Sequence, residues 1–431
     1  MIFARYHQLL GLIDPIRPIG NVVKVVGLVI ESEGPSASIG EICLIETNEG
    51  KRAAEVVGFR DNRTLLMPLG EMAGLTPGAN VTATGSPLKI NLGLSMLGRI
   101  IGGLGEPLDD KGPLPIEETR DTIAAPPDAV KRRRITESIA TGIRSIDAIC
   151  TLGKGQRMGI FSGSGVGKSI ILGMIARNTS ADVNVVCLVG ERGREVREFL
   201  ERDLGEEGLK RSVVVVVTSD KPALIRLKGA FIATTIAEYF RDQGADVMLM
   251  MDSVTRVAMA QREVGLSVGE PPTTRGYTPS VFALLPKLME RSGSAENGSI
   301  TALYTVLVEG DDMNEPVADH TRAILDGHII LSRQLASINH YPAVDVIPSI
   351  SRVMIDVVPE EHMNMARKVK EVIATYREAE DLINIGAYAK GSNKKIDFAI
   401  SVNDKVNQFL QQEMFDKVDY KQVQEGLLNL F

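Results

Sequence analysis

An eight-residue stretch with three glycines, a lysine and a terminal serine constrains the fold of this 431-residue chain more than any other feature. It lies between a short apolar run (158–161) and a segment of helix-forming apolar residues (170–175). Glycines let successive backbone N–H groups converge on one phosphate, and the N-terminus of a following helix adds partial positive charge. The stretch therefore predicts a strand, a phosphate-binding loop and a helix; the loop comprises Ser162, Gly163, Ser164, Gly165, Val166, Gly167, Lys168 and Ser169.

Two side chains at the end of this loop suit the phosphates of a nucleotide and its metal ion. Lys168 can reach the β- and γ-phosphates, and the hydroxyl of Ser169 can bind Mg²⁺. Ser162 stands where such a loop usually has its first glycine, and because serine is small we expect the loop to close all the same. The alternative is a glycine-rich loop without function, which Gly-Lys-Ser in this context disfavours.

Hydrophobic periodicity divides the rest of the chain into parts. Short β runs separated by turn residues predict a small barrel, and a Lys/Glu-rich helical pattern fills the last seventy or so residues. Between them, runs without polar alternation fit strands buried on both faces and predict a parallel sheet; these runs are 185–189, 213–217, 247–251, 300–308 and 329–331. The expected class is α/β, with an N-terminal amphipathic segment, a β-barrel, a P-loop (RecA-like) core and a helical domain at residues 1–20, 21–90, 91–358 and 359–431.

Charge and aromatic content disfavour nucleic acid as the main partner. The formal net charge is −7, there is no tryptophan, and aromatic residues make up 4% of the chain. Nucleic-acid binders usually carry a basic excess and often stack bases on aromatic rings. The one basic run, at residues 131–134, is interpreted as a solvated connector between domains rather than as a phosphate-backbone patch.

Cysteine spacing and hydropathy indicate a cytoplasmic protein. Cys43, Cys150 and Cys187 are scattered, which fits a reducing compartment and neither a disulfide framework nor a zinc site. No stretch reaches the ~18 apolar residues that a membrane-spanning helix needs. Peripheral contact with a membrane remains open.

Two acidic residues each follow a run that is predicted to be a buried strand. The carboxylates that act together with a phosphate loop are expected at such positions. Asp252 ends the run 247–251 and is a candidate for the Mg²⁺ site. Glu191 follows the run 185–189, at the edge where open α/β sheets bind ligands, and is a candidate to polarise an attacking water. Arg192 and Glu195 are candidates to support phosphate and a Mg²⁺-bound water. A charged, solvated helix start is the alternative explanation for residues 191–195.

These residues resemble the signature of the rotary ATPase superfamily, which includes ATP synthase catalytic subunits and type III secretion ATPases. The likeness covers nearly the whole chain and includes the motifs at 97–107 and 141–147. It implies that Glu191 activates water, that Arg192 is a phosphate-side arginine, and that Lys168, Ser169 and Asp252 act on phosphate and Mg²⁺. The implied reaction is Mg²⁺-dependent hydrolysis of ATP to ADP and phosphate.

Three further positions come from the resemblance alone. Tyr341 looks like the aromatic residue that stacks on adenine, and Phe409 like a residue that closes the adenine pocket from the helical domain. Arg352 looks like an arginine finger that reaches into the site of the next subunit. A finger supplied in trans requires a ring, so the resemblance implies a homo-hexamer.

Within the superfamily, the motifs at 190–199, 309–316 and 385–391 are similar to the export ATPases, and the run 276–286 favours the flagellar branch. That branch implies a ring at the cytoplasmic face of the inner-membrane export gate. The ring would release cargo from chaperones, bind a stator-like regulator through its N-terminal segment and hold a stalk-like coiled coil in its pore.

Other functions remain open from the sequence. A virulence type III secretion ATPase is close to the flagellar one, and an ATP synthase catalytic subunit is disfavoured by the export-type motifs. A non-catalytic ring subunit would not need Glu191. A hexameric RNA translocase with the same core is disfavoured by the acidic balance, and an RNA-stimulation assay would identify it.

Overall fold

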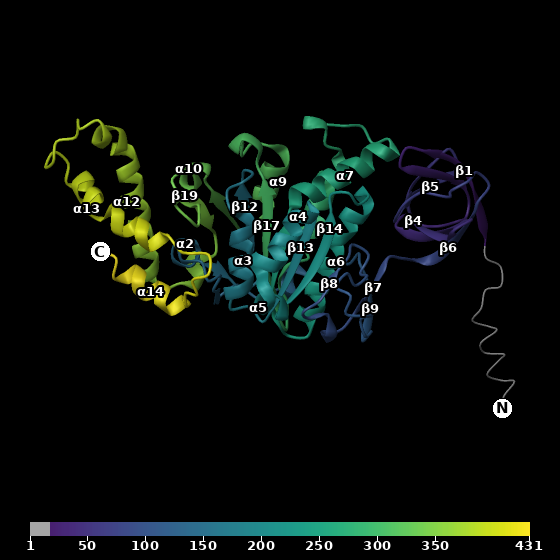
Figure 1. Ribbon diagram of the computed structural model, residues 1–431, viewed down its shortest axis with the longest axis horizontal. Coiled ribbons are helices and arrows are strands. Elements are labelled where there is room, and N and C mark those ends of the chain that lie inside the picture. Colours follow the sequence, from purple (N-terminus) through teal and green to yellow (C-terminus); the bar gives the residue numbers. More distant parts are fainter. Residues whose placement is uncertain (1–17) are drawn as a thin grey trace, which may run out of the picture.

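The computed structural model describes residues 18–431, so nearly all of the expected N-terminal partner-binding segment, residues 1–20, lies outside the described residues. Three parts follow one another along the long axis of the molecule (Figure 1). A barrel stands at one end, a sheet flanked by helices forms the centre, and a helical domain stands at the other end. The architecture expected from the sequence is confirmed.

The barrel is small and closed, with strand order β1-β2-β5-β4-β3-β6. Alternate residues of its strands point inward and form a separate apolar core, which includes Val22, Ile30, Ile45 and Val56. Closure pairs every strand on both sides and so removes the free edges of the sheet. Its strands are β1 (Ile19–Val26), β2 (Val29–Glu33), β3 (Glu41–Thr47), β4 (Gly50–Arg60), β5 (Arg63–Pro68) and β6 (Asn80–Pro87).

The central sheet has the order β19-β18-β12-β17-β15-β13-β14-β8, and all neighbours in this series except β19 and β18 are parallel. The apolar runs of the sequence lie in its strands, as expected. The strands are β8 (Ile100–Ile101), β12 (Arg157–Ser162), β13 (Val183–Glu191), β14 (Ser212–Thr218), β15 (Asp246–Asp252), β17 (Ser299–Leu307), β18 (Gly327–Leu331) and β19 (Val344–Ser351). Short pairs flank the sheet: β7 (Lys89–Leu92) with β9 (Glu118–Asp121), β10 (Ser138–Ile139) with β11 (Leu152–Gly153), and β16 (Gly293–Ser294) on β17.

Both faces of this sheet are buried, which explains why its strands lack polar alternation. In β15, Val247, Leu249 and Met251 belong to one apolar core, whereas Met248 and Met250 belong to the other. Successive side chains of a strand point to opposite faces, so a strand covered on both sides is apolar throughout. The helices of the central part are α2 (Arg144–Ile149), α3 (Lys168–Asn178), α4 (Gly193–Glu198), α5 (Gly205–Lys210), α6 (Ala223–Asp242), α7 (Val254–Val268), α8 (Pro279–Met289), α9 (Pro316–Ile324), α10 (Arg333–Ser337) and α11 (Met354–Val357).

The helical domain shares one of these two cores with the sheet. Val369 and Val406 pack in the same apolar cluster as Met248 and the helix α3 residue Leu172. Its helices are α12 (Glu360–Asn384), α13 (Lys394–Leu410) and α14 (Tyr420–Leu428). Because the core is continuous, the helical domain is fixed against the nucleotide-loop side of the sheet.

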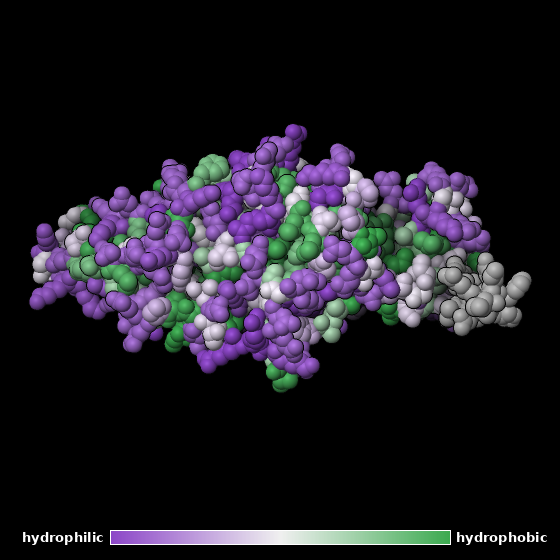
Figure 2. All heavy atoms as spheres, turned by 90° about the horizontal axis from the view of Figure 1, so that it is seen from below, coloured by the Kyte–Doolittle hydropathy of each residue, from purple (hydrophilic) through white to green (hydrophobic). Residues whose placement is uncertain are grey.

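The outer surface is mostly hydrophilic on the face that Figure 2 shows, with hydrophobic side chains in small groups. In residues 18–431, no helix combines the length and the apolar character that crossing a bilayer requires.

The basic run at 131–134 differs from the solvated connector expected. Arg132 donates hydrogen bonds to the carbonyls of Ser292 and Glu290, and Arg133 donates to those of Ala295 and Gly298. Guanidinium groups carry several donors in a planar fork and so can satisfy carbonyls left unpaired at a chain turn. The run therefore fastens the connector to the central domain.

The ion pair of Arg291 with Glu238 is buried in this domain. Arg291 is 1% exposed, and its Nε donates to Oε1 of Glu238 at 2.9 Å. Further hydrogen bonds run from Arg291 to the carbonyl of Thr122 and to the hydroxyl of Thr235.

Replacing Glu238 by alanine leaves the buried charge of Arg291 without its counter-ion. We expect Glu238→Ala to lower the free energy of unfolding by about 3–5 kcal/mol. The exposed pair of Lys395 and Glu371, whose side chains are 77% and 62% exposed, provides the control, because Glu371→Ala should cost ~0–1 kcal/mol. Urea denaturation of both variants measures the difference, and equal losses would contradict the importance of the buried pair.

Candidate nucleotide site

The predicted phosphate loop connects the end of β12 to the start of α3. Gly165 and Gly167 have φ angles of +80° and +92°, a backbone conformation that residues with a Cβ rarely adopt. A Cβ on Gly165 would meet nothing within 4 Å, so the loop is open on that side. No side chain caps α3, whose first N–H groups are left to bind a ligand.

Three charged side chains meet beside this loop. Lys168 forms an ion pair with Asp252, and its Nζ lies 3.5 Å from Oε1 of Glu191. The hydroxyl of Thr305 donates to Oδ1 of Asp252 at 2.8 Å. Strands β13, β15 and β17 are parallel neighbours, so their carboxyl ends deliver Glu191, Asp252 and the region of Thr305 to one edge.

Burial and mutual charge set the protonation of this group. Burial raises the pKa of Glu191 to about 7; Lys168 lowers it in part, whereas Asp252 and a hydrogen bond with Glu195 raise it. For Lys168, burial favours the neutral amine, but the carboxylates of Asp252 and Glu191 outweigh it and raise the pKa. The lysine is thus a cation, and Glu191 changes its charge near neutral pH.

The oxygen ligands here fit Mg²⁺, which prefers carboxylate and hydroxyl oxygens and keeps several of its waters. Ser169 is half-buried at the start of α3, and in the described part of the chain its hydroxyl has no protein partner. Asp252 is 2% exposed and aims its carboxylate at Lys168. Within residues 18–431 there is no cluster of three or more His, Cys, Asp or Glu suited to a metal. A Mg²⁺ site formed by Ser169 and Asp252 would therefore depend on phosphate oxygens as further ligands.

The two candidates that follow Glu191 lie at the rim. The side chain of Arg192, the residue before α4, is 82% exposed, and its Nη1 lies 3.8 Å from Oε1 of Glu195 in the first turn of that helix. Glu195 in turn shares a hydrogen bond with Glu191, which lowers its own pKa. The structure thus connects Glu195 to the three charged groups, whereas Arg192 points to solvent.

The sequence analysis did not single out Arg256, in the first turn of α7. Its Nε is buried without a hydrogen-bond partner, and its side chain packs against Gly190, directly before Glu191. A buried guanidinium nitrogen without a protein partner could be satisfied by an anionic ligand or by water. Its position four residues after Asp252, at the start of the helix after the strand, is the signal that could have identified it.

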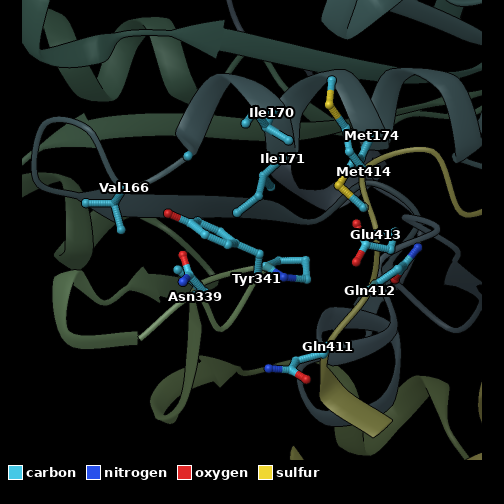
Figure 3. Close-up of a pocket in the computed structure, with 13 residues that line it drawn as sticks. Val166, Ile170, Ile171, Met174, Asn339, Tyr341, Gln411, Gln412, Glu413 and Met414 are labelled. Atoms are coloured by element: carbon cyan, nitrogen blue, oxygen red, sulfur yellow. The ribbon is translucent and has the colours of Figure 1, made fainter. Parts of the chain in front are cut away.

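A cavity of about 430 Å³ adjoins the loop on the side of α3. Figure 3 shows the ring of Tyr341 in it, below the α3 side chains Ile170 and Ile171 and directed toward Val166, with the segment 411–414 to the right. The ring carbon Cε1 of Tyr341 lies 3.6 Å from where a Cβ on Gly167 would stand. An apolar cavity with an aromatic ring next to a phosphate loop suits the base of a nucleotide.

Phe409, expected to close the adenine pocket, does not border this cavity, and its role stays a prediction. It borders a separate hollow next to Gly426, and the guanidinium carbon of Arg144 stands 5.9 Å from the centre of its ring. The helix α13 ends at Leu410, so Phe409 is held on its last turn, and the irregular residues 411–414 reach the cavity instead.

Arg352 lies at the opposite edge of the sheet. It directly follows β19, which is antiparallel to β18 and pairs Ser351 with Gly327, the first residue of β18. Lys168 belongs to the other edge, where β18 ends, and the five residues of β18 separate the two edges by roughly 15 Å. Arg352 is exposed, and in the part of the chain described its side chain has no ion-pair partner. It therefore cannot serve the site of its own chain.

Known protein families match each of the three parts of the chain. Family models match residues 22–85 (ATP synthase alpha/beta family, beta-barrel domain), 142–351 (its nucleotide-binding domain) and 358–429 (T3SS EscN ATPase C-terminal domain). A flagellum-specific ATP synthase of Bacillus subtilis is 58% identical over 93% of this chain and 92% of its own length. A type 3 secretion system ATPase of Xanthomonas euvesicatoria is 50% identical over 92% and 90%.

Solved structures show the same fold. The assembled ATPase EscN of the enteropathogenic E. coli type III secretion system matches with a TM-score of 0.91 at 47% identity, over 95% of this chain and 99% of that one. EscN in complex with its central stalk EscO matches with a TM-score of 0.89 at 46% identity, over the same shares.

Proposed function

Since this chain belongs to the family of flagellum-specific ATP synthases and type 3 secretion system ATPases, we propose that it hydrolyses ATP, in a ring of identical subunits, to energise flagellar protein export. The C-terminal match to the T3SS EscN ATPase domain supports the export branch over an ATP synthase catalytic subunit. The higher identity to the Bacillus subtilis flagellar relative supports flagellar export over virulence secretion.

The proposed chemistry assigns one task to each side chain. The loop amides and Lys168 hold the β- and γ-phosphates, and the cavity around Tyr341 takes the adenine. Glu191 orients a water whose oxygen bonds to the γ-phosphorus while the bond from this phosphorus to the β–γ bridging oxygen breaks. The water's proton passes to Glu191 or to solvent, and ADP and phosphate leave. Ser169 and Asp252 would hold Mg²⁺, which when bound neutralises charge on the phosphates.

The position of Arg352 is the observation that carries the ring. Within residues 18–431, Arg352 is exposed, has no ion-pair partner and lies at the edge opposite Lys168, so we expect it to complete a site in a neighbouring copy. In such a copy it would place positive charge where negative charge grows in the transition state. The assembled EscN structure supports a hexamer, and its complex with EscO supports a stalk-like partner in the pore.

The wider setting follows from the same family. We infer a cytoplasmic ring that docks peripherally at the export gate on the inner membrane and releases cargo from chaperones. The apolar residues near the N-terminus, such as Phe3, Leu10 and Ile13, would bind a stator-like regulator. No nucleic acid is expected, in keeping with the net charge of −7.

The ring model predicts a concentration-dependent ATPase. Specific activity should rise with protein concentration as rings assemble. Glu191→Gln should lower kcat by about 10²–10⁴, and Arg352→Ala by about 10³–10⁵, while both variants still bind ADP. Steady-state assays over a range of protein concentrations test this. Activity independent of concentration, with Arg352→Ala unaffected, would show that the site is not shared.

The ionisation of Glu191 predicts the pH dependence. Its pKa is raised to about 7, so below that pH the carboxyl is already protonated and cannot take up a proton from the attacking water. We expect kcat/KM of the wild type to rise as pH increases through about 7, because this ratio reports groups of the free enzyme. The residual activity of Glu191→Gln should lack this rise. A wild-type profile that is flat across neutral pH would argue against Glu191 as the acceptor.

A further inference from the structure

One wall of the cavity that contains the ring of Tyr341 comes from the helical domain. It is formed by residues 411–414, in the irregular segment between α13 and α14. Figure 3 shows Gln412, Glu413 and Met414 side by side next to Tyr341. Because this segment is neither helix nor strand, its position depends on its hydrogen bonds to the rest of the molecule.

Gln412 makes four of those bonds, more than any other residue of the wall. It is 6% exposed, and its backbone N–H donates to the carbonyl of Tyr341 at 3.0 Å. Its side-chain Oε1 accepts from the backbone N–H of Arg144 at 2.8 Å. Its Nε2 donates to the carbonyls of Gly142 at 2.9 Å and Asp416 at 3.2 Å. The amide of Gln412 thus joins the wall to the nucleotide-binding domain.

The loop that receives Gln412 is itself fixed. The fully buried carboxylate of Asp147 accepts from the backbone N–H and hydroxyl of Thr141, at 2.8 and 2.7 Å, and from the N–H of Gly142 at 2.9 Å. Gly142 has φ of +74° and packs so closely on Asn178, at the end of α3, that a Cβ there would lie 2.3 Å from the Cβ of Asn178. Gln412 is therefore anchored to a rigid partner.

Two arginines hold the same segment through its backbone. Arg144 donates to the carbonyl of Gln411 at 3.0 Å, and Arg177 donates to that of Met414 at 2.6 Å. Arg177 lies on α3, the helix that begins at the phosphate loop. In this set, Gln412 is the residue of the wall that contributes its own side chain.

We propose that Gln412 is a positioning residue for the nucleotide. Its amide holds the 411–414 wall against the 142–144 loop and Tyr341. The affinity for the base of the nucleotide therefore depends on the contact between the helical domain and the nucleotide-binding domain. This proposal rests on the proposed function, because it takes adenine as the occupant of the cavity.

The test compares Gln412→Ala and Gln412→Met with wild type in the full-length chain. Gln412→Met keeps the length of the side chain without its polar atoms. The control is Gln408→Ala, an exposed glutamine four residues earlier on α13 that does not border the cavity. We measure kcat and KM for ATP hydrolysis, the Kd for ADP by calorimetry, and inhibition by inorganic tripolyphosphate, which has no base.

Both Gln412 variants should raise the KM for ATP and the Kd for ADP about tenfold, the effect of losing buried hydrogen bonds. Their kcat and their inhibition constant for tripolyphosphate should stay near wild type, because the phosphate loop is untouched. Gln408→Ala should leave all four values unchanged. The split between base-containing and base-free ligands separates a local role in positioning from general destabilisation.

The proposal is overturned if either variant binds ADP like wild type. It is also overturned if tripolyphosphate binding falls as much as ADP binding, since the defect would then not be on the base side. If Gln412→Ala does not fold, Gln412→Met decides. A wild type that binds ADP but never hydrolyses ATP would refute the proposed function, whereas the ADP measurements would still test Gln412.

Discussion

The interaction on which the nucleotide site depends is the contact of Lys168 with Asp252 and Glu191. A buried lysine between two carboxylates is stable only if both acids are held at the right place, since an unpaired buried charge is costly. The parallel sheet meets this need because the strands β13 and β15 end at the same edge of the sheet as β12, where its loop begins. The carboxylates are the counter-ions of Lys168 in this structure. In the proposed reaction, phosphate would replace them in that role and leave Asp252 for a metal ion and Glu191 for water.

A second constraint is the direction of the last strand. Since β19 runs antiparallel to β18, Tyr341, three residues before the start of β19, lies near the cavity, and Arg352, directly after its end, lies at the far edge. One protomer thus carries a base-binding ring at one edge of its sheet and an exposed arginine at the other. This arrangement is the physical basis of the proposed ring, in which the two edges of one subunit would belong to two different sites.

Much of the fold and part of the site were predictable from local sequence. The runs such as 247–251 identify strands buried on both faces, and the Gly-Lys-Ser loop identifies the helix start and its lysine. Contacts between distant segments were not predictable. Phe409 lies outside the cavity because α13 continues to Leu410, Arg132 is fastened by carbonyls more than 150 residues away, and Gln412 reaches a loop 270 residues earlier. Neither hydrophobic periodicity nor motif spacing contains such information. The roles of Arg192 and Arg352 stay predictions.

Mixing two inactive variants tests the shared site most directly. Glu191→Gln subunits retain Arg352, and Arg352→Ala subunits retain Glu191, so a ring that contains both has some sites with both groups intact. In a random equal mixture, about a quarter of the sites would be complete, each with its arginine supplied in trans. The account predicts that the mixture recovers ATPase activity well above either variant alone. Activity no higher than the average of the two variants would show that Glu191 and Arg352 do not act together across a subunit boundary.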